Sequence, residues 1–405
     1  MKKSLVSLAV LALAGTASAQ SYVTLSGVID VGVSGYQNTS ETPLGVTAKT
    51  SKTALSQGAW GASRLIFKGQ EDLGGGLGAA FYLDAALFPD DGTTGGNVAN
   101  SGPSVNGLFN RRSTISFLSP WGEFRLGRDY TPEFWNDNVF DPFLTSGVGT
   151  NLISTANGYS NNGAAVNGFQ ANNMYVRASN SVGYFLPPDL GGIYGQVMYA
   201  FNEQSSYDPG ILTPNVPNNS RAGGYIGGRL GYTKSKLDIA ASYSRATLAD
   251  NYFAGLTTKL DTFNMGASYD FDVVKIMAEY SRAELKTTSS SVVPTGNFNG
   301  SPTGTGFLLG FTLPIGPGII RGSYAQLTID PNRLVQLTAN PKAEKWAIGY
   351  VHNLSKRTAL YTTVAQINNK NGYDLGIGGS PAYVLAGTFQ AKTSRGFDLG
   401  IRHFF

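Results

Sequence analysis

The residues that could perform acid–base or nucleophilic chemistry are few. The chain of 405 residues has two histidines, His352 and His403, and no cysteine. Histidine is the side chain that titrates near neutral pH, but His352 adjoins a short polar turn and His403 lies two residues from the chain end. No G-x-S-x-G, H-E-x-x-H, P-loop or EF-hand pattern occurs. We therefore expect no enzyme, no metal and no other cofactor.

Charged residues are the second possible source of chemistry, and their pattern is local. The chain has 30 Lys and Arg against 26 Asp and Glu, a balance that favours neither nucleic acid nor an acidic partner. Where polar and apolar residues alternate, the polar face carries ten basic residues, namely Arg64, Lys68, Arg112, Arg125, Arg177, Arg229, Lys275, Arg321, Lys345 and Arg402, and six acidic ones, namely Asp30, Asp84, Asp129, Asp238, Glu279 and Asp398. If this face lined an aqueous passage, such a local positive excess would favour the entry of anions.

The charges lie on alternating runs that are typical of β-strands. Such alternation places successive side chains on opposite faces of a strand, and no helical period competes with it. In the first run Val23 and Leu25 alternate with Thr24 and Ser26. Sixteen runs have the approximate ranges 22–35, 62–71, 77–86, 110–119, 123–130, 177–186, 191–201, 221–232, 236–246, 260–271, 273–284, 304–315, 318–329, 342–354, 357–368 and 394–405.

The connections between these runs alternate between short and long. Seven short ones consist of turn-forming residues, for example SPWG at 119–122 and NLSKR at 353–357. Eight long ones lie near 36–61, 87–109, 131–176, 202–220, 247–259, 285–303, 330–341 and 369–393. Transmembrane barrels of the outer membrane have this asymmetry, with short periplasmic turns and long external loops.

The two ends of the chain favour export and closure. Residues 1–19 have a basic start, an apolar stretch and the site Ala17-Ser18-Ala19, which is the anatomy of a secretory signal peptide. We therefore expect the barrel domain to comprise residues 20–405. The last run, GFDLGIRHFF, ends on Phe404 and Phe405. Its backbone groups need a partner, which the first run supplies if the sheet closes on itself.

These patterns predict an all-β fold, a 16-stranded antiparallel transmembrane β-barrel. A soluble β-sandwich would also alternate, but runs of about ten residues match a tilted membrane crossing. A barrel of this size is too wide for side chains to fill, so it encloses an aqueous channel.

Several stretches together resemble one known family over essentially the whole mature chain. They are VTLSGVIDVGV, SRLIFKGQEDLGGGL, FNRRSTISFLSPWGEFRLGRDYTP, IGYVHNLSKRTALY and GIRHFF. The chain resembles the β-proteobacterial general diffusion porins of Gram-negative bacteria, and among them the trimeric anion-selective members. The resemblance implies a homotrimer in the outer membrane, surrounded by lipid and lipopolysaccharide, and a loop after the fifth strand that folds into the barrel and narrows it.

The resemblance also implies which residues line the narrow zone. Matched by motif, its basic side consists of Arg64, Arg112 or its neighbour Arg111, and Arg177, although a shift of the alignment by seven residues would place Gln170 at the third position. Lys68 and Arg125 are further candidates for the basic side. Glu133, Asp137 and Asp141 of the inward loop are candidates for an opposing acidic side, and the alternative is that they bond the backbone of their own loop. For Lys345 and Arg402 we expect a carboxylate that neutralises the charge.

The resulting prediction is a passive diffusion channel for small hydrophilic solutes with a preference for anions. Its alternatives are a substrate-selective channel or an outer-membrane hydrolase on a barrel scaffold, for which both histidines lie at the wrong end. By resemblance, Phe405 is the terminal aromatic that the barrel-assembly machinery recognises. Phe404, one residue earlier, should point into the barrel.

Overall fold

The structure consists almost entirely of β-strands. The computed structural model describes residues 21–156, 172–205, 220–251, 256–289, 301–331 and 339–405, so the expected signal peptide, 1–19, lies outside it. In these ranges no helix has the length and hydropathy to cross a membrane. The elements are β1 (Tyr22–Glu41), β2 (Thr47–Gln57), β3 (Arg64–Gly74), β4 (Leu77–Phe88), β5 (Thr93–Thr94), β6 (Gly96–Asn97), β7 (Asn106–Gly107), β8 (Arg112–Ser119), β9 (Gly122–Tyr130), α2 (Pro132–Val139), η1 (Gly147–Gly149), α3 (Ile153–Ala156), β10 (Arg177–Phe185), β11 (Ile193–Ala200), β12 (Tyr225–Lys234), β13 (Leu237–Asn251), β14 (Leu256–Asp270), β15 (Lys275–Ser289), β16 (Thr303–Ile315), β17 (Gly318–Asp330), β18 (Lys342–Asn353), β19 (Thr358–Lys370) and β20 (Gln390–Phe404).

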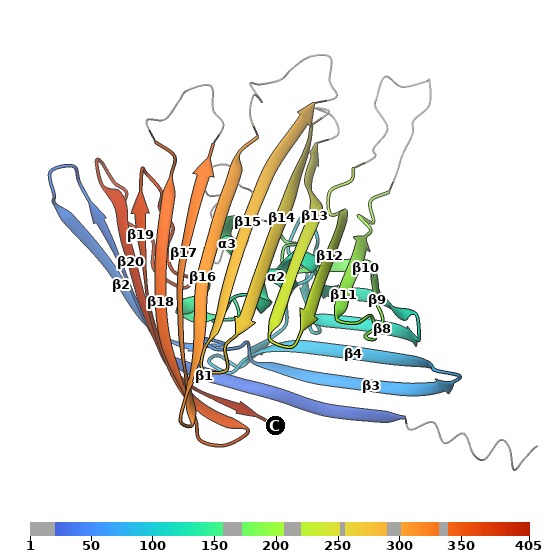
Figure 1. Cartoon of the computed structure of the whole chain (residues 1–405). Helices are drawn as coiled ribbons and strands as arrows, with labels where there is room; N and C mark the ends of the chain where they lie inside the picture. The colour runs from blue at the N-terminus through green and yellow to red at the C-terminus, as the bar shows by residue number, and fades with distance from the viewer. Residues whose placement is uncertain (1–20, 157–171, 206–219, 252–255, 290–300, 332–338) are drawn as a thin grey trace, which may run out of the picture.

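The strands form a closed antiparallel barrel with sixteen positions around its wall. The first strand, β1, closes the ring because Tyr22–Val28 pairs with β3 and Val28–Glu41 pairs with the last strand, β20. Four of the strands add no position of their own. β2 pairs with the outer half of β1, in line with β3, β5 pairs with the end of β4, and β6 and β7 pair with each other in a separate small sheet. Figure 1 shows β12 to β19 side by side in the wall. The predicted fold is therefore confirmed.

The expected topology and alternation are also confirmed. All seven short connections join neighbouring antiparallel strands, and the C-terminus lies at the end of the barrel that carries short turns (Figure 1). On β12, Ile226 and Leu230 point outward and are more than half exposed. The neighbouring inward position on β13, Ser242, is buried by the contents of the barrel. An apolar outer face is what a wall in contact with lipid requires.

One expected loop, 36–61, is largely strand. β1 continues to Glu41, and β2 returns beside it with Gln57 opposite Val31. The sequence YQNTSE is polar on both faces of the strand, so its alternation carried no apolar signal. Only residues 58–63 remain irregular between β2 and β3, and this segment turns toward the interior.

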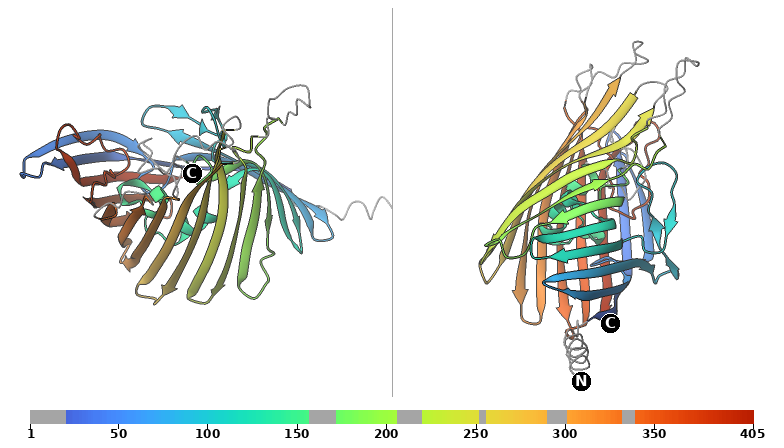
Figure 2. Two further views of the ribbon diagram at one scale, coloured as in Figure 1. Left: turned by 90° about the horizontal axis from the view of Figure 1, so that it is seen from above. Right: turned by 90° about the vertical axis from the view of Figure 1, so that its right-hand side faces the viewer.

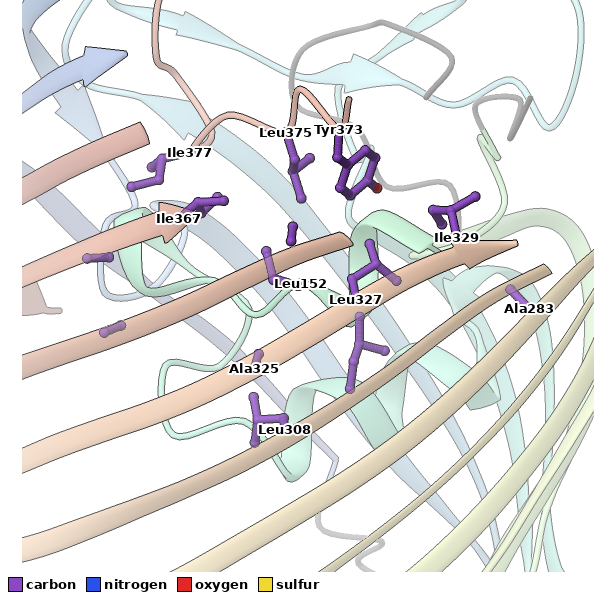
Figure 3. Packing of buried hydrophobic residues seen from close by; sticks show 14 of the residues in the cluster. Leu152, Ala283, Leu308, Ala325, Leu327, Ile329, Ile367, Tyr373, Leu375 and Ile377 are labelled. Carbon is purple, nitrogen blue, oxygen red and sulfur yellow. The ribbon is translucent and has the colours of Figure 1, made fainter. Parts of the chain in front are cut away.

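Besides the short segment 58–63, two long connections, rather than one, fold into the barrel. The loop 131–176 contributes Phe143, Val148, Leu152 and Ile153 to an apolar cluster, and the connection after β19 contributes Tyr373, Leu375 and Ile377. Both pack on inward side chains such as Leu308 and Leu327 from β16 and β17, as Figure 3 shows. The inner wall is therefore apolar in this region, where alternation alone predicts polar residues.

The two C-terminal phenylalanines have different surroundings. Phe405 exchanges two backbone hydrogen bonds with Gly27, both 3.1 Å long. Its ring lies directly over Gly27 and leaves no room for a side chain there. Phe404 lies on the inner face, where the guanidinium of Arg402 is 4.6 Å from its ring. The end of the chain therefore closes the barrel through Phe405, whereas the ring of Phe404 takes no part in that closure.

Deletion of Phe405 should impair folding more than Phe404→Ala. The deletion removes two closing hydrogen bonds, and each backbone group left unpaired costs about 1–3 kcal/mol. The fraction of folded barrel recovered on refolding into detergent, measured by heat-dependent electrophoretic mobility, tests this difference. Equal losses for the two variants would contradict it.

Candidate functional site

The loop that follows β9 is built to turn inward. Thr131 lies before α2 and its hydroxyl donates to the carbonyl of Tyr175 at 2.5 Å, which holds the two ends of the loop together. Pro132 then opens α2, a position where its missing N–H is not needed. Helix α2 contacts β12, β13 and β14, while α3 contacts β15, β16 and β17. Both helices lie inside the curved wall (Figure 2).

The three acidic residues of this loop are buried and bonded to protein groups. Glu133, Asp137 and Asp141 are at most 1% exposed. Glu133 accepts a hydrogen bond from Tyr225 of β12, and Asp137 accepts from Tyr175 and Asn151. The sequence predicted that these three residues form the acidic side of a narrow zone. In the structure they do not line the cavity that is described below.

Asp141 bonds the backbone of its own loop, as the alternative interpretation predicted. Its carboxylate accepts from the backbone N–H of Phe143 at 2.8 Å and of Thr145 at 3.1 Å, and from the side chain of Asn151 at 3.1 Å. These bonds fix the bend between α2 and η1. The loop is therefore held by carboxylates that are removed from solvent.

A cavity of about 640 Å³ lies between the other face of the loop and the opposite wall. The loop lines it with neutral side chains, among them Phe134, Trp135, Asn138 and Thr145. The wall lines it with five arginines, Arg64, Arg111, Arg112, Arg177 and Arg402, and one carboxylate, Asp84. These are all the charged residues around the cavity in the described part of the chain. The cavity therefore carries a large positive excess.

Arg111 and Arg177 are held by one tyrosine. Their guanidinium groups donate to the hydroxyl of Tyr130 at 2.8 and 2.7 Å. The guanidinium of Arg177 also lies 4.3 Å from the Tyr130 ring, which stacks on Phe134 of the loop with 5.5 Å between ring centroids. Arg111 pairs with Asp84 at 3.4 Å. Tyr130 thus connects the basic wall to the loop.

Arg112 and Arg64 complete this side of the wall. Arg112 lies 3.6 Å from Asp129 and 4.3 Å from the ring of Tyr82. Arg64, at the start of β3, forms no ion pair with any residue the structure describes. Arg177 lines the cavity from the first position of β10, whereas the alternative, Gln170, lies outside the described residues.

Two further basic candidates lie apart from the cavity. Arg125 pairs with Glu123 at 2.8 Å and with Asp129 at 2.5 Å. Lys68 lies on the same face of β3 as Arg64, further along the strand toward the short connection, and does not line the cavity.

Arg402 is the residue that the sequence reasoning misjudged. The expected neutralising ion pair is wrong for it, because within the described ranges Arg402 has no carboxylate oxygen within 4.0 Å, and it lines the cavity. Lys345 also lacks a carboxylate at that distance among the described residues, and it donates instead to the carbonyl of Thr150 in the loop. Trp60, which contacts Arg402, was not identified, because an isolated tryptophan in a polar segment carries no signal of where it points.

Comparisons with known proteins agree with this architecture. A family model described as Gram-negative porin matches residues 5–372. An outer membrane porin, protein 32 of Delftia acidovorans, is 35% identical over the whole length of both chains. An outer membrane porin of Bordetella pertussis is 31% identical over 89% of this chain and 93% of its own. A solved anion-selective porin from Comamonas acidovorans is 31% identical, with a TM-score of 0.73 over 95% of this chain and all of its own.

Burial of the loop carboxyls gives its attachment a pH dependence. Burial raises the pKa of Glu133 from 4.5 to about 7, and burial together with the nearby charge of Asp141 raises the pKa of Asp137. Because the folded state binds these protons more tightly than the unfolded state, the stabilisation is complete below about pH 4.5 and is lost as the pH rises to about 7.

The variant Glu133→Gln should make stability less dependent on pH. Between pH 4.5 and 7 the wild type loses stabilisation on the order of 3 kcal/mol, because the carboxyl of Glu133 releases its proton more easily in the unfolded state. Glutamine resembles the protonated acid and does not titrate, so the variant should not show this loss. Thermal unfolding followed by circular dichroism from pH 4.5 to 8 measures the effect. We expect the unfolding temperature of the wild type to fall more steeply with pH. Parallel curves would show that Glu133 does not titrate in this range.

Proposed function

The chain belongs to the Gram-negative porin family, so it is a passive channel of the outer membrane and not an enzyme, and we propose that it passes small hydrophilic solutes with a preference for anions. The observation that carries the proposal is the cavity with five arginines and one carboxylate. Solutes would cross it between the basic wall and the neutral face of the loop. No covalent step is involved.

The arrangement of the acids supports the preference as much as that of the arginines. Glu133, Asp137 and Asp141 are buried and do not line the cavity, so they do not present a negative wall to a passing anion. Asp84, the acid that lines the cavity, is already engaged by Arg111. Arg112 lies beside Asp129. The other three cavity arginines form no ion pair with a described residue, so their charges are available to the solute, and they are Arg64, Arg177 and Arg402.

The size of the effect depends on distance and screening. A single charge 4 Å from an anion is worth roughly 4 kcal/mol at an effective dielectric constant of 20. Salt reduces this beyond a Debye length of about 8 Å at physiological ionic strength. Several arginines around one cavity are therefore sufficient for selectivity, and the preference should weaken at high salt. The Comamonas relative that is 31% identical is described as anion-selective.

The assembly state is part of the proposal. We infer a homotrimer surrounded by outer-membrane lipid and lipopolysaccharide, on the strength of the family resemblance. Phe405, whose ring is exposed on the outer side of the barrel, would be read by the barrel-assembly machinery. The mass of the detergent-solubilised protein, by light scattering, should be three times that of one chain; a monomeric mass would contradict the trimer.

The reversal potential of the reconstituted channel across a gradient of potassium chloride tests the function directly. We expect its sign to indicate chloride preference, with a smaller permeability ratio at higher salt. A preference for potassium would overturn the charge assignment, and absence of conductance would overturn the channel.

Arg64→Ser should lower the chloride preference more than Lys68→Ser does. The two variants remove the same charge from the same face of β3, but only Arg64 lines the cavity. We expect a decrease in the permeability ratio of about twofold or more for Arg64→Ser, because the lost charge lies at the narrow zone. The double variant Arg64→Ser, Arg112→Ser should lower it further. Equal shifts for Arg64→Ser and Lys68→Ser would show that position along the pore does not matter.

A further inference from the structure

β2 and β3 lie in line beside β1, and the irregular segment 58–63 between them leaves the wall. It separates β2 from β3, and its residues Gly58 to Ala62 line the cavity. Gly58 has a φ of +73°, which allows the chain to turn away from the wall at this point. The segment brings Trp60 into the barrel, where the side chain is 9% exposed.

Beside this segment, two opposite charges face each other without forming a pair. Asp30 of β1 and Arg402 of β20 are directly opposite in the strand register. Opposite charges in such positions normally interact across the strands. Here, across the described part of the barrel, Arg402 forms no ion pair within 4.0 Å, and its Nε has no hydrogen-bond partner. Something therefore separates the two side chains.

The carboxylate of Asp30 is already occupied by the segment. One oxygen accepts from the backbone N–H of Trp60 at 3.0 Å and of Gly61 at 2.8 Å. The other accepts from the hydroxyl of Tyr361 at 2.5 Å. Ser63 bonds the backbone of Asp30 as well, at 2.8 and 3.0 Å. Asp30 is thus bound as the anchor of the segment, and these three bonds leave about one of the four acceptor sites of its carboxylate for Arg402.

Arg402 rests on the indole ring instead. Its guanidinium lies 3.1 Å from the centroid of Trp60, a cation–π arrangement. The other neighbours of Trp60 hold the ring in place: Tyr361 packs edge-on with 6.1 Å between centroids, and the guanidinium of Arg321 lies 5.5 Å from the ring. An aromatic face holds a guanidinium in place without neutralising its charge.

We propose that Trp60 is a positioning residue that keeps Arg402 unpaired and directs its charge into the cavity. The segment has two actions: its backbone N–H groups bind Asp30, and its indole holds Arg402. Together they replace a close cross-strand ion pair with a guanidinium that lines the cavity and touches no carboxylate. The importance of Trp60 for the channel rests on the proposed anion preference. Its contacts with Arg402 and Asp30 do not depend on that preference.

The first test compares Trp60→Leu with Trp60→Phe by reversal potential. Leucine removes the ring, so Arg402 can approach Asp30, and we expect the chloride preference to fall by about twofold, close to the value for Arg402→Ser. Phenylalanine keeps an aromatic face and should retain most of the preference. Heat-dependent electrophoretic mobility confirms that each barrel is folded. An unchanged ratio in Trp60→Leu would overturn the inference.

A second test remains informative if Trp60→Leu does not fold. Arg402→Lys preserves the charge but not the planar stacking group, so it should lower the chloride preference if stacking positions the charge. If only the charge matters, Arg402→Lys will match the wild type, and the inference is wrong.

A third test separates pairing from general disturbance. Asp30→Asn should raise the chloride preference more in the Trp60→Leu background than in the wild type, because only there would Asp30 hold Arg402. Equal effects in both backgrounds would contradict the proposed competition. The change in permeability ratio between variants tests the role of Trp60, whichever ion the wild type prefers. The ion that the wild type prefers tests the proposed function.

Discussion

The need to pair every backbone N–H and C=O group within the membrane is the constraint on which the structure depends. Lipid offers these groups no partner, so a sheet can cross it only as a closed ring. A single strand, β1, closes the barrel here. Its first part, Tyr22–Val28, pairs with β3, and its longer second part, Val28–Glu41, pairs with β20. The terminal bonds between Gly27 and Phe405 extend the same seam to the end of the chain.

A closed ring of this size leaves an interior that must be partly filled to be selective. The chain uses two inward connections that share an apolar cluster with the inner wall. Apolar contacts alone would allow the loop to slide. The polar bonds at Glu133, Asp137 and Asp141 fix its position and, because they are buried, they also keep negative charge away from the cavity. Attachment of the loop and electrostatics of the channel are therefore consequences of one arrangement.

The arginines illustrate how charge can be concentrated without being neutralised. A guanidinium next to a carboxylate loses its field, and Arg125, between Glu123 and Asp129, is an example. The cavity arginines Arg177 and Arg402 instead lie over Tyr130 and Trp60, and neither forms an ion pair with a residue that the structure describes. Aromatic faces compensate part of the desolvation of a cation and leave its net charge in place.

The alternation of residue types was enough to predict the barrel, the order of its strands, its short turns and the inward direction of most charged wall residues. A period of two in a lipid-facing strand records which face each side chain occupies. By resemblance to the family the sequence also predicted basic residues at the narrow zone, namely Arg64, Arg112 or Arg111, and Arg177 or Gln170. It did not indicate the outer half of β1, where both faces are polar, or the second inward connection through Tyr373. Which of these charges are left without a carboxylate partner depends on how distant segments pack together. Arg402 and Asp30 lie near opposite ends of the chain but are opposite each other in register, and whether they pair depends on an indole from a third segment, which no local pattern encodes.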